Sequence, residues 1–327
     1  MGAFFILMKR ALFFVGIILP VLLISTSAKH NVSKREAIDK KAAIELGKKL
    51  FYDPIMSRDC TISCSSCHKP ELAFTDGLKT SIGIKGRVVS RNSPTLANFE
   101  NQPYFLLDGV NNSLESQVTV PIQEHTEFDF HILLLVERLK KDSLYLALSL
   151  KAYGEEPSTV VITHSIAEFE RTIVSNNSAF DKYKNGDTTA LNNSQLRGKN
   201  IFFEKLYCGE CHNQENLTDY SLTNNGLYEV YADSGRMRKT ELEKDRAIFK
   251  VPTLRNIELT APYMHDGSLS NLNDVISHYS SGGKEHKNKS EIIKPFSLTE
   301  QEKEDLINFL KSLTDYDFLT NPEYKIN

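Results

Sequence analysis

The sequence has no tryptophan, only five cysteines and five methionines, and a net charge of −3 over 327 residues. The missing tryptophan excludes an indole from every site in this chain. Basic residues form no stripe with interleaved aromatic residues, which argues against nucleic acid as a partner. Alternating patterns that predict β-strands are nearly absent, so a mostly α fold is favoured.

The N-terminal apolar run, from Ala11 to Ile24, is short for a transmembrane helix. Lys9-Arg10 precede this run, and the small residues Ser25–Ala28 follow it. A basic start, an apolar stretch and small residues at a cleavage point are typical of a secretory signal. We therefore predict a signal peptide over residues 1–28, with Met8 as the start. An uncleaved membrane anchor is the alternative.

Four of the five cysteines lie in two copies of one short motif, Cys-x-x-Cys-His. Two cysteines at this spacing, followed directly by histidine, form the attachment signature of c-type haem. Both thiols can then form thioethers with the haem vinyl groups while the imidazole ligates the iron. We therefore predict two covalently bound haems. The residues expected to hold them are Cys64, Cys67, His68, Cys208, Cys211 and His212.

Other uses of paired cysteines fit this sequence less well. Two Cys-x-x-Cys pairs could bind zinc, but such pairs usually lie close together, and these are far apart. A redox-active dithiol is possible at either motif alone, although neither lies between a strand and a helix. Cys60, the remaining cysteine, is expected to be a small buried or inert thiol. Because c-type haem is attached outside the bacterial cytoplasmic membrane, the motifs agree with export to the periplasm.

The stretch before each motif is also repeated in the sequence. Gly47–Tyr52 precedes the first motif, and Gly198–Phe203, with a similar sequence, precedes the second. This duplication predicts two cytochrome-c-like haem domains, residues 29–187 and 188–327.

Helical spacing of apolar residues accounts for most of the secondary structure. Helices are predicted over 30–53, 114–121, 131–151, 165–174, 194–204, 271–279 and 299–313. The last opens with a capping box formed by Thr299 and Glu302. In the stretches 75–108 and 217–250 the apolar residues show no regular spacing, which indicates long irregular loops.

Several further stretches match a known family. They are Leu46–Pro54, Asn92–Thr95, Leu114–Gln117 with Pro121-Ile122 and Glu127, Phe249–Asn256 and Leu259–Gly267. On these motifs the chain resembles the bacterial di-haem cytochrome c peroxidases and their relatives, the MauG-type enzymes. The resemblance covers the chain in order from about residue 36 to residue 315.

The resemblance implies different roles for the two haems. The haem ligated by His68 would react with hydrogen peroxide, and the haem ligated by His212 would store or relay electrons. The family places a glutamate and a glutamine in the peroxide pocket, at the positions of Glu127 and Gln117. A carboxylate can move a proton between the peroxide oxygens, and an amide can orient the peroxide. The alternative is that Glu127 is a solvated acid beside Glu124.

The family also carries a calcium ion between its haem domains. Asn92 and the carbonyl groups of Thr260 and Pro262 match its ligand positions, and calcium prefers such oxygen ligands. The alternative for Asn92 is an ordinary turn residue before Ser-Pro.

A first departure from the peroxidases concerns the second ligand of the C-terminal haem, which is a methionine in conventional peroxidases. No methionine follows Met264 here, and the aligned residue is Tyr279, as in MauG-type enzymes. A tyrosinate donates more charge than a thioether and favours high oxidation states of the iron. The alternatives are that His278 ligates this iron, or that Tyr279 is a structural residue packed at the end of its helix.

Two further departures concern the N-terminal haem and the space between the haems. Conventional peroxidases close the resting N-terminal haem with a histidine, and Ile84 stands at that position. Isoleucine cannot ligate iron, so we expect an open haem that needs no reductive activation. Leu107 stands where the family usually has a tryptophan between the haems, and Tyr104 or Phe105 could substitute. His265 is expected near a haem propionate or the domain interface.

Together these observations predict an exported di-haem enzyme that reduces hydrogen peroxide to water. A small redox protein, a cytochrome c or a cupredoxin, would supply the electrons, and the family makes a homodimer possible. MauG-like oxidation of residues on a partner protein is the main alternative. A di-haem electron carrier without catalysis is another, although Ile84 and Glu127 argue against it. A peroxide-sensing protein is the remaining alternative.

Overall fold

The computed structural model of this chain describes residues 38–213 and 215–325. The predicted signal peptide, residues 1–28, lies outside the described residues. Glu36–Asn327 forms one compact unit. Within the described residues, we find no helix that is both long and apolar enough to cross a membrane.

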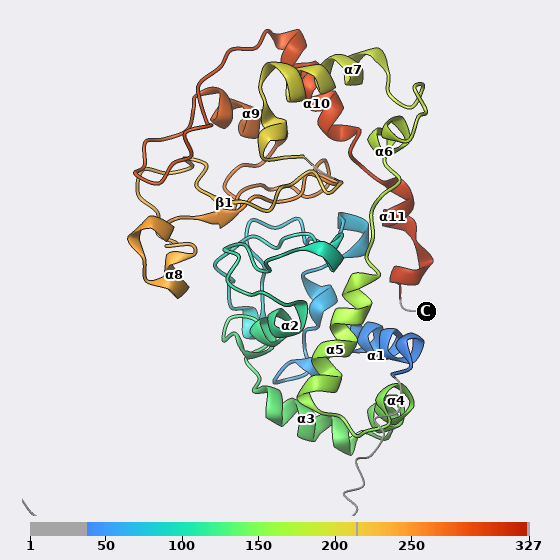
Figure 1. Cartoon of the computed structure of the whole chain (residues 1–327). Helices are drawn as coiled ribbons and strands as arrows, with labels where there is room; N and C mark the ends of the chain where they lie inside the picture. Colours follow the sequence, from blue (N-terminus) through green and yellow to red (C-terminus); the bar gives the residue numbers. More distant parts are fainter. Residues whose placement is uncertain (1–37, 214, 326–327) are drawn as a thin grey trace, which may run out of the picture. The chain divides into compact units, whose positions relative to one another are not determined.

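Helices form the N-terminal half of this unit (Figure 1). They are α1 (Lys40–Tyr52), α2 (Leu114–Gln123), α3 (Ile132–Lys141), α4 (Ser143–Tyr153) and α5 (Thr159–Arg171). α1 and α5 can pack closely because Gly47 lies where they cross. A Cβ added at Gly47 would lie 1.8 Å from the carbonyl oxygen of Ser165. Leu46 and Ile166 of these two helices are buried in the core beside this crossing.

The C-terminal half repeats this helix crossing. Its helices are α6 (Ala179–Lys184), α7 (Asn193–Asn200), α8 (Met237–Thr240), α9 (Leu272–Ser280) and α10 (Glu300–Lys311). The last helix, α11 (Tyr316–Thr320), packs against the N-terminal half. A Cβ added at Gly198 of α7 would lie 2.0 Å from the carbonyl oxygen of Asp305 in α10. Gly198 and Gly47 begin the two copies of the repeated segment, so both copies use the same close contact between helices.

Two short strands lie where the halves meet. β1 (Leu222–Thr223) and β2 (Phe249–Lys250) pair in antiparallel register, with Leu222 opposite Lys250. The backbone N–H of Lys250 also donates to the carbonyl oxygen of Leu107, at 2.7 Å, and so joins β2 to the N-terminal half. Helices dominate the described part of the chain, which confirms the predicted mostly α fold.

Some predicted helices have different bounds in the structure. The pattern over 131–151 predicts one helix, but the chain breaks at Asp142, whose carboxylate accepts hydrogen bonds from two backbone N–H groups and starts α4. The helix expected over 165–174 begins earlier, at Thr159. The predicted capping box at Thr299 is present and opens α10.

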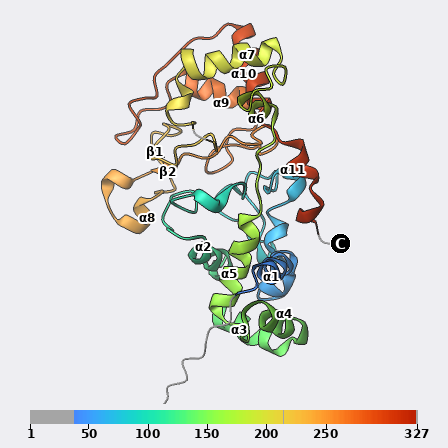
Figure 2. The ribbon, with the colours of Figure 1, turned by 45° about the vertical axis from the view of Figure 1, so that its right-hand side comes forward.

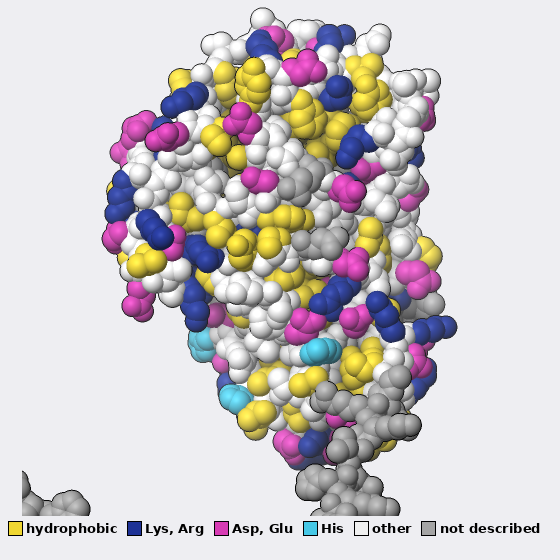
Figure 3. All heavy atoms as spheres, viewed as in Figure 1, with side chains coloured by type: hydrophobic (Ala, Val, Ile, Leu, Met, Phe, Trp, Pro, Cys, Tyr) yellow, Lys and Arg dark blue, Asp and Glu magenta, His cyan; other side chains and the backbone are white. Residues whose placement is uncertain are grey.

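After α10 the chain returns to the N-terminal half (Figure 2). There Phe318 and Tyr324 join the buried cluster that contains Phe51 and Phe74. On the face shown in Figure 3, lysine and arginine side chains are interspersed with aspartate and glutamate.

Candidate functional site

The first Cys-x-x-Cys-His motif forms a single tight turn. Cys64–Ser66 is a 3-10 turn, and the carbonyl oxygen of Cys64 accepts from the backbone N–H of Cys67 at 3.2 Å and of His68 at 3.0 Å. Ser63 opens the turn through a reciprocal capping box with Ser66. The turn therefore brings both thiols and the imidazole onto one short piece of backbone.

His68 has the hydrogen bonding of a metal ligand. Its Nδ1 lies 2.8 Å from the carbonyl oxygen of Phe74, with the hydroxyl of Ser93 at 3.4 Å. Donation from Nδ1–H to this carbonyl fixes the tautomer in which Nε2 keeps its lone pair. Burial also lowers the pKa of His68, which favours the neutral imidazole that ligates iron.

The second motif has the same construction. Cys208–Glu210 is a 3-10 turn, and the backbone N–H of His212 donates to the carbonyl oxygen of Cys208 at 2.9 Å. Nδ1 of His212 lies 3.1 Å from the carbonyl oxygen of Leu217, and burial lowers the pKa of this imidazole too. Each motif thus offers two thiols and one neutral, oriented imidazole, which is the donor set of a c-type haem.

The cysteines do not combine into a larger metal site. All five are free thiols, and no group of three or more His, Cys, Asp or Glu side chains within the described residues could hold a metal ion. Burial raises the pKa of Cys67 to about 11 and of Cys208 to about 12, so these thiols are protonated at neutral pH. Cys60 is exposed rather than buried, and its sulfur lies 3.3 Å from the guanidinium of Arg138.

Glu127 lies beside the first motif. Burial, with a smaller contribution from the charge of Glu124, raises the pKa of Glu127 to about 7. Burial raises the pKa of Cys64 and of Cys67, and the nearby charge of Glu127 raises both pKa values further. This environment differs from that of a solvated acid, and a carboxyl with a pKa near neutrality can both accept and return a proton.

Ile84 is held next to Glu127 by the backbone. Its N–H donates to the carbonyl oxygen of Glu127 at 3.0 Å, and its side chain is fully buried. Gly83 permits this approach, because a Cβ there would lie 2.0 Å from the carbonyl oxygen of Thr126. This loop therefore carries a buried alkyl side chain beside Glu127, and an alkyl group cannot ligate iron.

Gln117 lies on α2, one turn before Pro121. Its side-chain oxygen, Oε1, is buried and has no hydrogen-bond partner within the described residues. An unpaired buried amide oxygen costs free energy unless a bound molecule or water satisfies it. Gln117 can therefore hydrogen-bond a small polar ligand in the N-terminal half.

Glu170 is a second carboxyl beside the first motif, and the sequence patterns did not single it out. It lies on α5, is 5% exposed, and its Oε2 has no partner within the described residues. Burial raises the pKa of Glu170 to about 8, and its charge is the largest charge effect on the pKa of Cys64. No clear signal in the sequence marks it, because α5 also carries Glu168 and Arg171 and has the pattern of an amphipathic helix.

Tyr279 faces the second motif from α9. Burial raises the pKa of its phenol, and the nearby Cys208 and Cys211 raise it further. The neighbouring His278 instead bonds through Nε2 to the carbonyl oxygen of Asn225, at 3.1 Å. The ring of His278 is therefore engaged with the backbone, whereas the Tyr279 phenol lies near the cysteines.

The two halves are joined by buried charges near Leu107. Asp108 is fully buried and pairs with Arg91 at 2.8 Å and with Arg238. Arg91 also binds both carboxylate oxygens of Asp233, at 2.6 and 2.9 Å. The Asp108–Arg238 and Arg91–Asp233 pairs connect the N-terminal half to the segment between β1 and β2.

Aromatic side chains near this junction take different positions. His265 stacks on Phe249 of β2, with ring centroids 4.2 Å apart. Phe105 is buried against Phe99 in the N-terminal core, and Tyr104 lies under the guanidinium of Arg236. His265 and Phe249 therefore form the stacked pair at the interface.

Asn92 lies against the segment that carries Thr260 and Pro262. Its backbone N–H donates to the carbonyl oxygen of His265 at 2.9 Å. Its side-chain Nδ2 donates to the carbonyl oxygen of Leu78 at 2.9 Å. Because the amide nitrogen is used in this way, the amide oxygen is the atom that remains for a cation.

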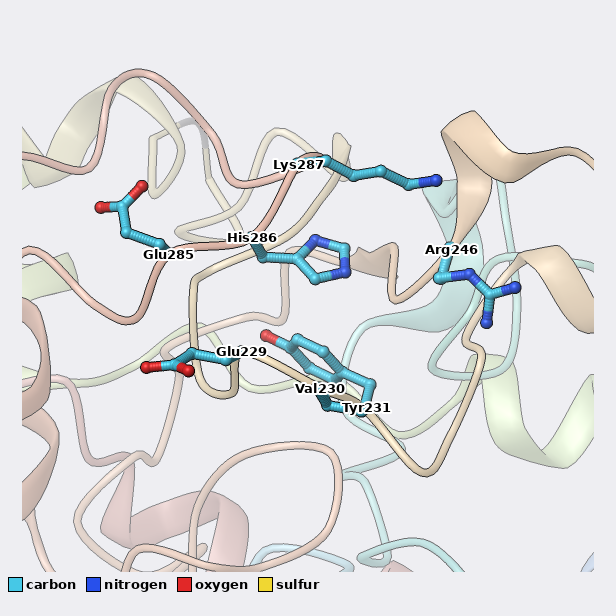
Figure 4. A pocket seen from close by; sticks show the side chains of 7 residues that line it. All are labelled: Glu229, Val230, Tyr231, Arg246, Glu285, His286 and Lys287. Carbon is cyan, nitrogen blue, oxygen red and sulfur yellow. The ribbon is translucent and has the colours of Figure 1, made fainter.

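An open hollow of about 590 Å³ lies elsewhere in the C-terminal half (Figure 4). In Figure 4 the acids Glu229 and Glu285 lie on one side of it, and Lys287 and Arg246 lie on the other. None of the candidate site residues lines this hollow.

Comparisons with known proteins identify the family. Residues 41–189 match the family model described as di-haem cytochrome c peroxidase, and residues 195–314 match the cytochrome c model. The methylamine utilization protein MauG of Methylorubrum extorquens is 37% identical over 274 residues, 83% of this chain and 77% of that protein. The chain belongs to the di-haem cytochrome c peroxidase and MauG family.

Other family members agree with this assignment. Cytochrome c551 peroxidase of Nitrosomonas europaea is 35% identical over 287 residues, 86% of this chain and 81% of that protein. The crystal structure of a MauG-like protein associated with microbial copper homeostasis matches with a TM-score of 0.82 at 33% identity. It covers 87% of this chain and 93% of the solved chain.

Family membership confirms several predictions. The diheme peroxidase BthA of Burkholderia thailandensis shares the fold, with a TM-score of 0.73 at 20% identity. The family confirms cytochrome c domains, two c-type haems and an oxidoreductase that acts on peroxide.

Proposed function

We propose that this chain is a di-haem peroxidase that reduces hydrogen peroxide to two molecules of water, using two protons and two electrons from a small redox protein. The observation that carries this proposal is Glu127, a carboxyl with a pKa of about 7 that lies beside the Cys64–His68 motif and next to Ile84. A proton carrier and an adjacent side chain that cannot ligate iron are what peroxide cleavage requires.

The residues around the first motif have separate tasks in this reaction. Cys64, Cys67 and His68 would hold the haem, whose iron supplies the peroxide-binding position and the electrons for cleavage of the O–O bond. Glu127 accepts the proton of the inner peroxide oxygen and returns it to the outer oxygen, which leaves as water. Gln117 orients the peroxide by a hydrogen bond.

The second motif would serve electron transfer. Cys208, Cys211 and His212 would hold the haem, and we propose Tyr279 as a further ligand of its iron. A phenolate ligand lowers the reduction potential of the iron compared with a thioether. The Asp108–Arg238 and Arg91–Asp233 ion pairs join the halves that carry the two sites.

Four finer points belong to the same proposal. Asn92, with the carbonyl groups of Thr260 and Pro262, would bind calcium at the junction of the halves. Residues 29–187 and 188–327 would be the two haem domains. Export by a signal peptide over residues 1–28 would place the enzyme in the periplasm. A homodimer is expected from the family resemblance.

A second candidate function is oxidation of residues on a partner protein. Two observations favour it: Ile84 replaces the closing histidine of conventional peroxidases, and Tyr279 replaces their methionine. A relative at 37% identity carries the name methylamine utilization protein MauG. Turnover of peroxide with a reduced cytochrome c or cupredoxin distinguishes the two functions, because only the first consumes such a donor.

The decisive experiment begins with the number of haems per chain, measured from the pyridine haemochrome spectrum. Low-temperature EPR of the ferric protein as isolated then reports on each iron. We expect one high-spin signal from an open first haem and one low-spin signal from the second. Peroxide consumption should begin without prior reduction of the enzyme. Two low-spin signals, together with no reaction with peroxide, would overturn the proposal in favour of a plain electron carrier.

A further inference from the structure

The segment after α10 completes the core of the N-terminal half. It contains α11 (Tyr316–Thr320) and the 3-10 turn Pro322–Tyr324. Phe318 and Tyr324 are each 3% exposed and belong to the buried cluster around Phe74. Figures 1 and 2 show this segment running from α10 back to the side of the N-terminal half.

Hydrogen bonds fix the segment at both ends. Asp315, at its start, is buried and accepts from the backbone N–H groups of Asn176 and Asn177, both at 2.9 Å. At the other end, the hydroxyl of Tyr324 donates to the carbonyl oxygen of Thr172, at 3.0 Å, and accepts from the N–H of Val174, also at 3.0 Å. The two aromatic rings between these anchors therefore have defined positions.

Both rings press on Phe74. The centroid of the Phe74 ring lies 5.7 Å from that of Phe318 and 5.4 Å from that of Tyr324. Phe74 is fully buried and has a φ of +59°, in the left-handed region that side chains other than glycine rarely adopt. A residue keeps such a conformation only when its surroundings hold it there, and here the surroundings include the two rings.

The carbonyl group of Phe74 is the acceptor for Nδ1 of His68, at 2.8 Å. A strong hydrogen bond at Nδ1 gives the imidazole more anionic character and makes it a stronger ligand to iron. The direction of this carbonyl group follows from the backbone conformation of Phe74. The packing of Phe74 is thereby coupled to the electronic character of His68.

We propose that Phe318 and Tyr324 act as positioning residues that hold the Phe74 carbonyl group against His68 and so set the iron–imidazole bond of the first haem. This inference rests on the proposed haem at Cys64, Cys67 and His68. It makes residues beyond 315, which follow α10 in sequence, part of the control of the first haem.

The second haem site serves as an internal control. Its imidazole, His212, bonds to the carbonyl oxygen of Leu217, which is buried in the core of the C-terminal half. Among the residues that the structure describes, that core has no buried member beyond Leu313. Loss of the rings of Phe318 and Tyr324 should therefore change the first haem and leave the second unchanged.

The test compares Tyr324→Ala and Tyr324→Phe in the full-length protein with both haems attached. Resonance Raman spectroscopy of the ferrous protein measures the iron–histidine stretching frequency of the open haem, and spectroelectrochemistry gives the midpoint potentials of both haems. Tyr324→Ala should lower the frequency and raise the midpoint potential of the first haem alone. Tyr324→Phe keeps the ring and loses the hydroxyl hydrogen bonds, so it should lower thermal stability and keep the wild-type frequency.

Two further variants serve as a milder test and as a control. Phe318→Leu is a milder change for the case in which Tyr324→Ala does not fold, and it should shift the frequency in the same direction by a smaller amount. Tyr316→Ala, at a side chain of the same helix that is 65% exposed, should change nothing.

The outcomes separate this inference from the proposed function. An unchanged frequency in Phe318→Leu and in any folded Tyr324→Ala would overturn the inference, and so would an equal shift in Tyr324→Phe and Tyr324→Ala. Fewer than two haems per chain in the wild type would instead show that the proposed function fails and remove the basis of the inference.

Discussion

Ile84 and Glu127 are joined by one backbone hydrogen bond of 3.0 Å, from the N–H of Ile84 to the carbonyl oxygen of Glu127. The bond joins the backbone of Ile84, whose side chain is fully buried, to that of Glu127, whose carboxyl has a pKa of about 7. In the proposed function, Glu127 carries the proton and Ile84 does not ligate the iron.

Replacement of Glu127 tests the proton carrier. Glu127→Gln keeps the shape of the side chain and removes the acid, so turnover of peroxide should fall by roughly 10²- to 10⁴-fold. Glu124→Gln, at an exposed neighbour, is the matched control and should keep most of the activity. Steady-state rates and the EPR spectrum measured together show whether the haem itself is intact. Wild-type rates in Glu127→Gln would show that Glu127 does not carry a proton in the reaction and is an ordinary solvated acid.

The pH dependence of the reaction follows from the same carboxyl. Its pKa is about 7, and it accepts a proton only when ionised, so the rate of peroxide cleavage should fall as the pH drops through about 7. The charge of Glu124 contributes to this raised pKa, so Glu124→Gln should shift the acid limb of the pH–rate profile to lower pH. Stopped-flow rates between pH 5 and pH 9 measure both effects. A limb that stays in place in Glu124→Gln contradicts this explanation.

Glu170 should make stability depend on pH. Its pKa is about 8 in the folded protein, well above the 4.5 of an ordinary glutamate, so the folded state holds this proton more tightly than the unfolded chain does. The free energy of unfolding should therefore decrease between about pH 4.5 and pH 8, by about 1.4 kcal/mol for each unit of pKa difference at most. Glu170→Gln should remove this loss, as thermal melts at pH 5 and pH 9 can show. Glu155→Gln, at an exposed acid, should behave as the wild type.

Tyr279 and His278 can be separated by paired variants. Tyr279→Phe should alter the low-spin EPR signal of the second haem. It should also raise the midpoint potential of this haem, because the variant loses a strongly donating phenolate ligand. His278→Gln should leave both unchanged, since its imidazole bonds to the carbonyl oxygen of Asn225. The opposite result, a change in the His278 variant alone, would assign the ligand to His278.

A histidine at position 84 should close the first haem. Ile84→His restores the residue type that the conventional peroxidases use, on a loop whose backbone is fixed to Glu127. The high-spin EPR signal should be lost in favour of a second low-spin signal, and reaction with peroxide should then require prior reduction. Ile84→Val is the matched control and should stay high-spin. A persistent high-spin signal in Ile84→His would mean that position 84 does not face the iron.

The sequence was most informative where chemistry is local. The attachment motifs, the duplicated Gly47 and Gly198 segments and the capping box at Thr299 each depend on residues a few positions apart. Their structural counterparts are two similar turns, two similar helix crossings and the start of α10. The family resemblance then supplied Glu127 and Tyr279, which lie far from the motifs in sequence and near them in the structure.

Properties that depend on packing could not be predicted in this way. Glu170 occupies a helical position whose burial is decided only when α5 meets its neighbours, so its pattern resembled that of any amphipathic helix. The break at Asp142 depends on a side chain that caps a new helix within one continuous apolar pattern. The exposure of Cys60 and the return of residues 316–325 to the N-terminal half have no periodic signature.

That return also sets an order of events during folding. The hydroxyl of Tyr52 donates to the carbonyl oxygen of Tyr324, which lies 272 residues later in the chain. The core of the N-terminal half is therefore complete only when nearly the entire polypeptide is available, and contacts of such separation form slowly. Until Phe318 and Tyr324 arrive, the loop that carries Phe74 lacks the rings that cover it, and the thiols of Cys64 and Cys67 belong to an unfinished domain.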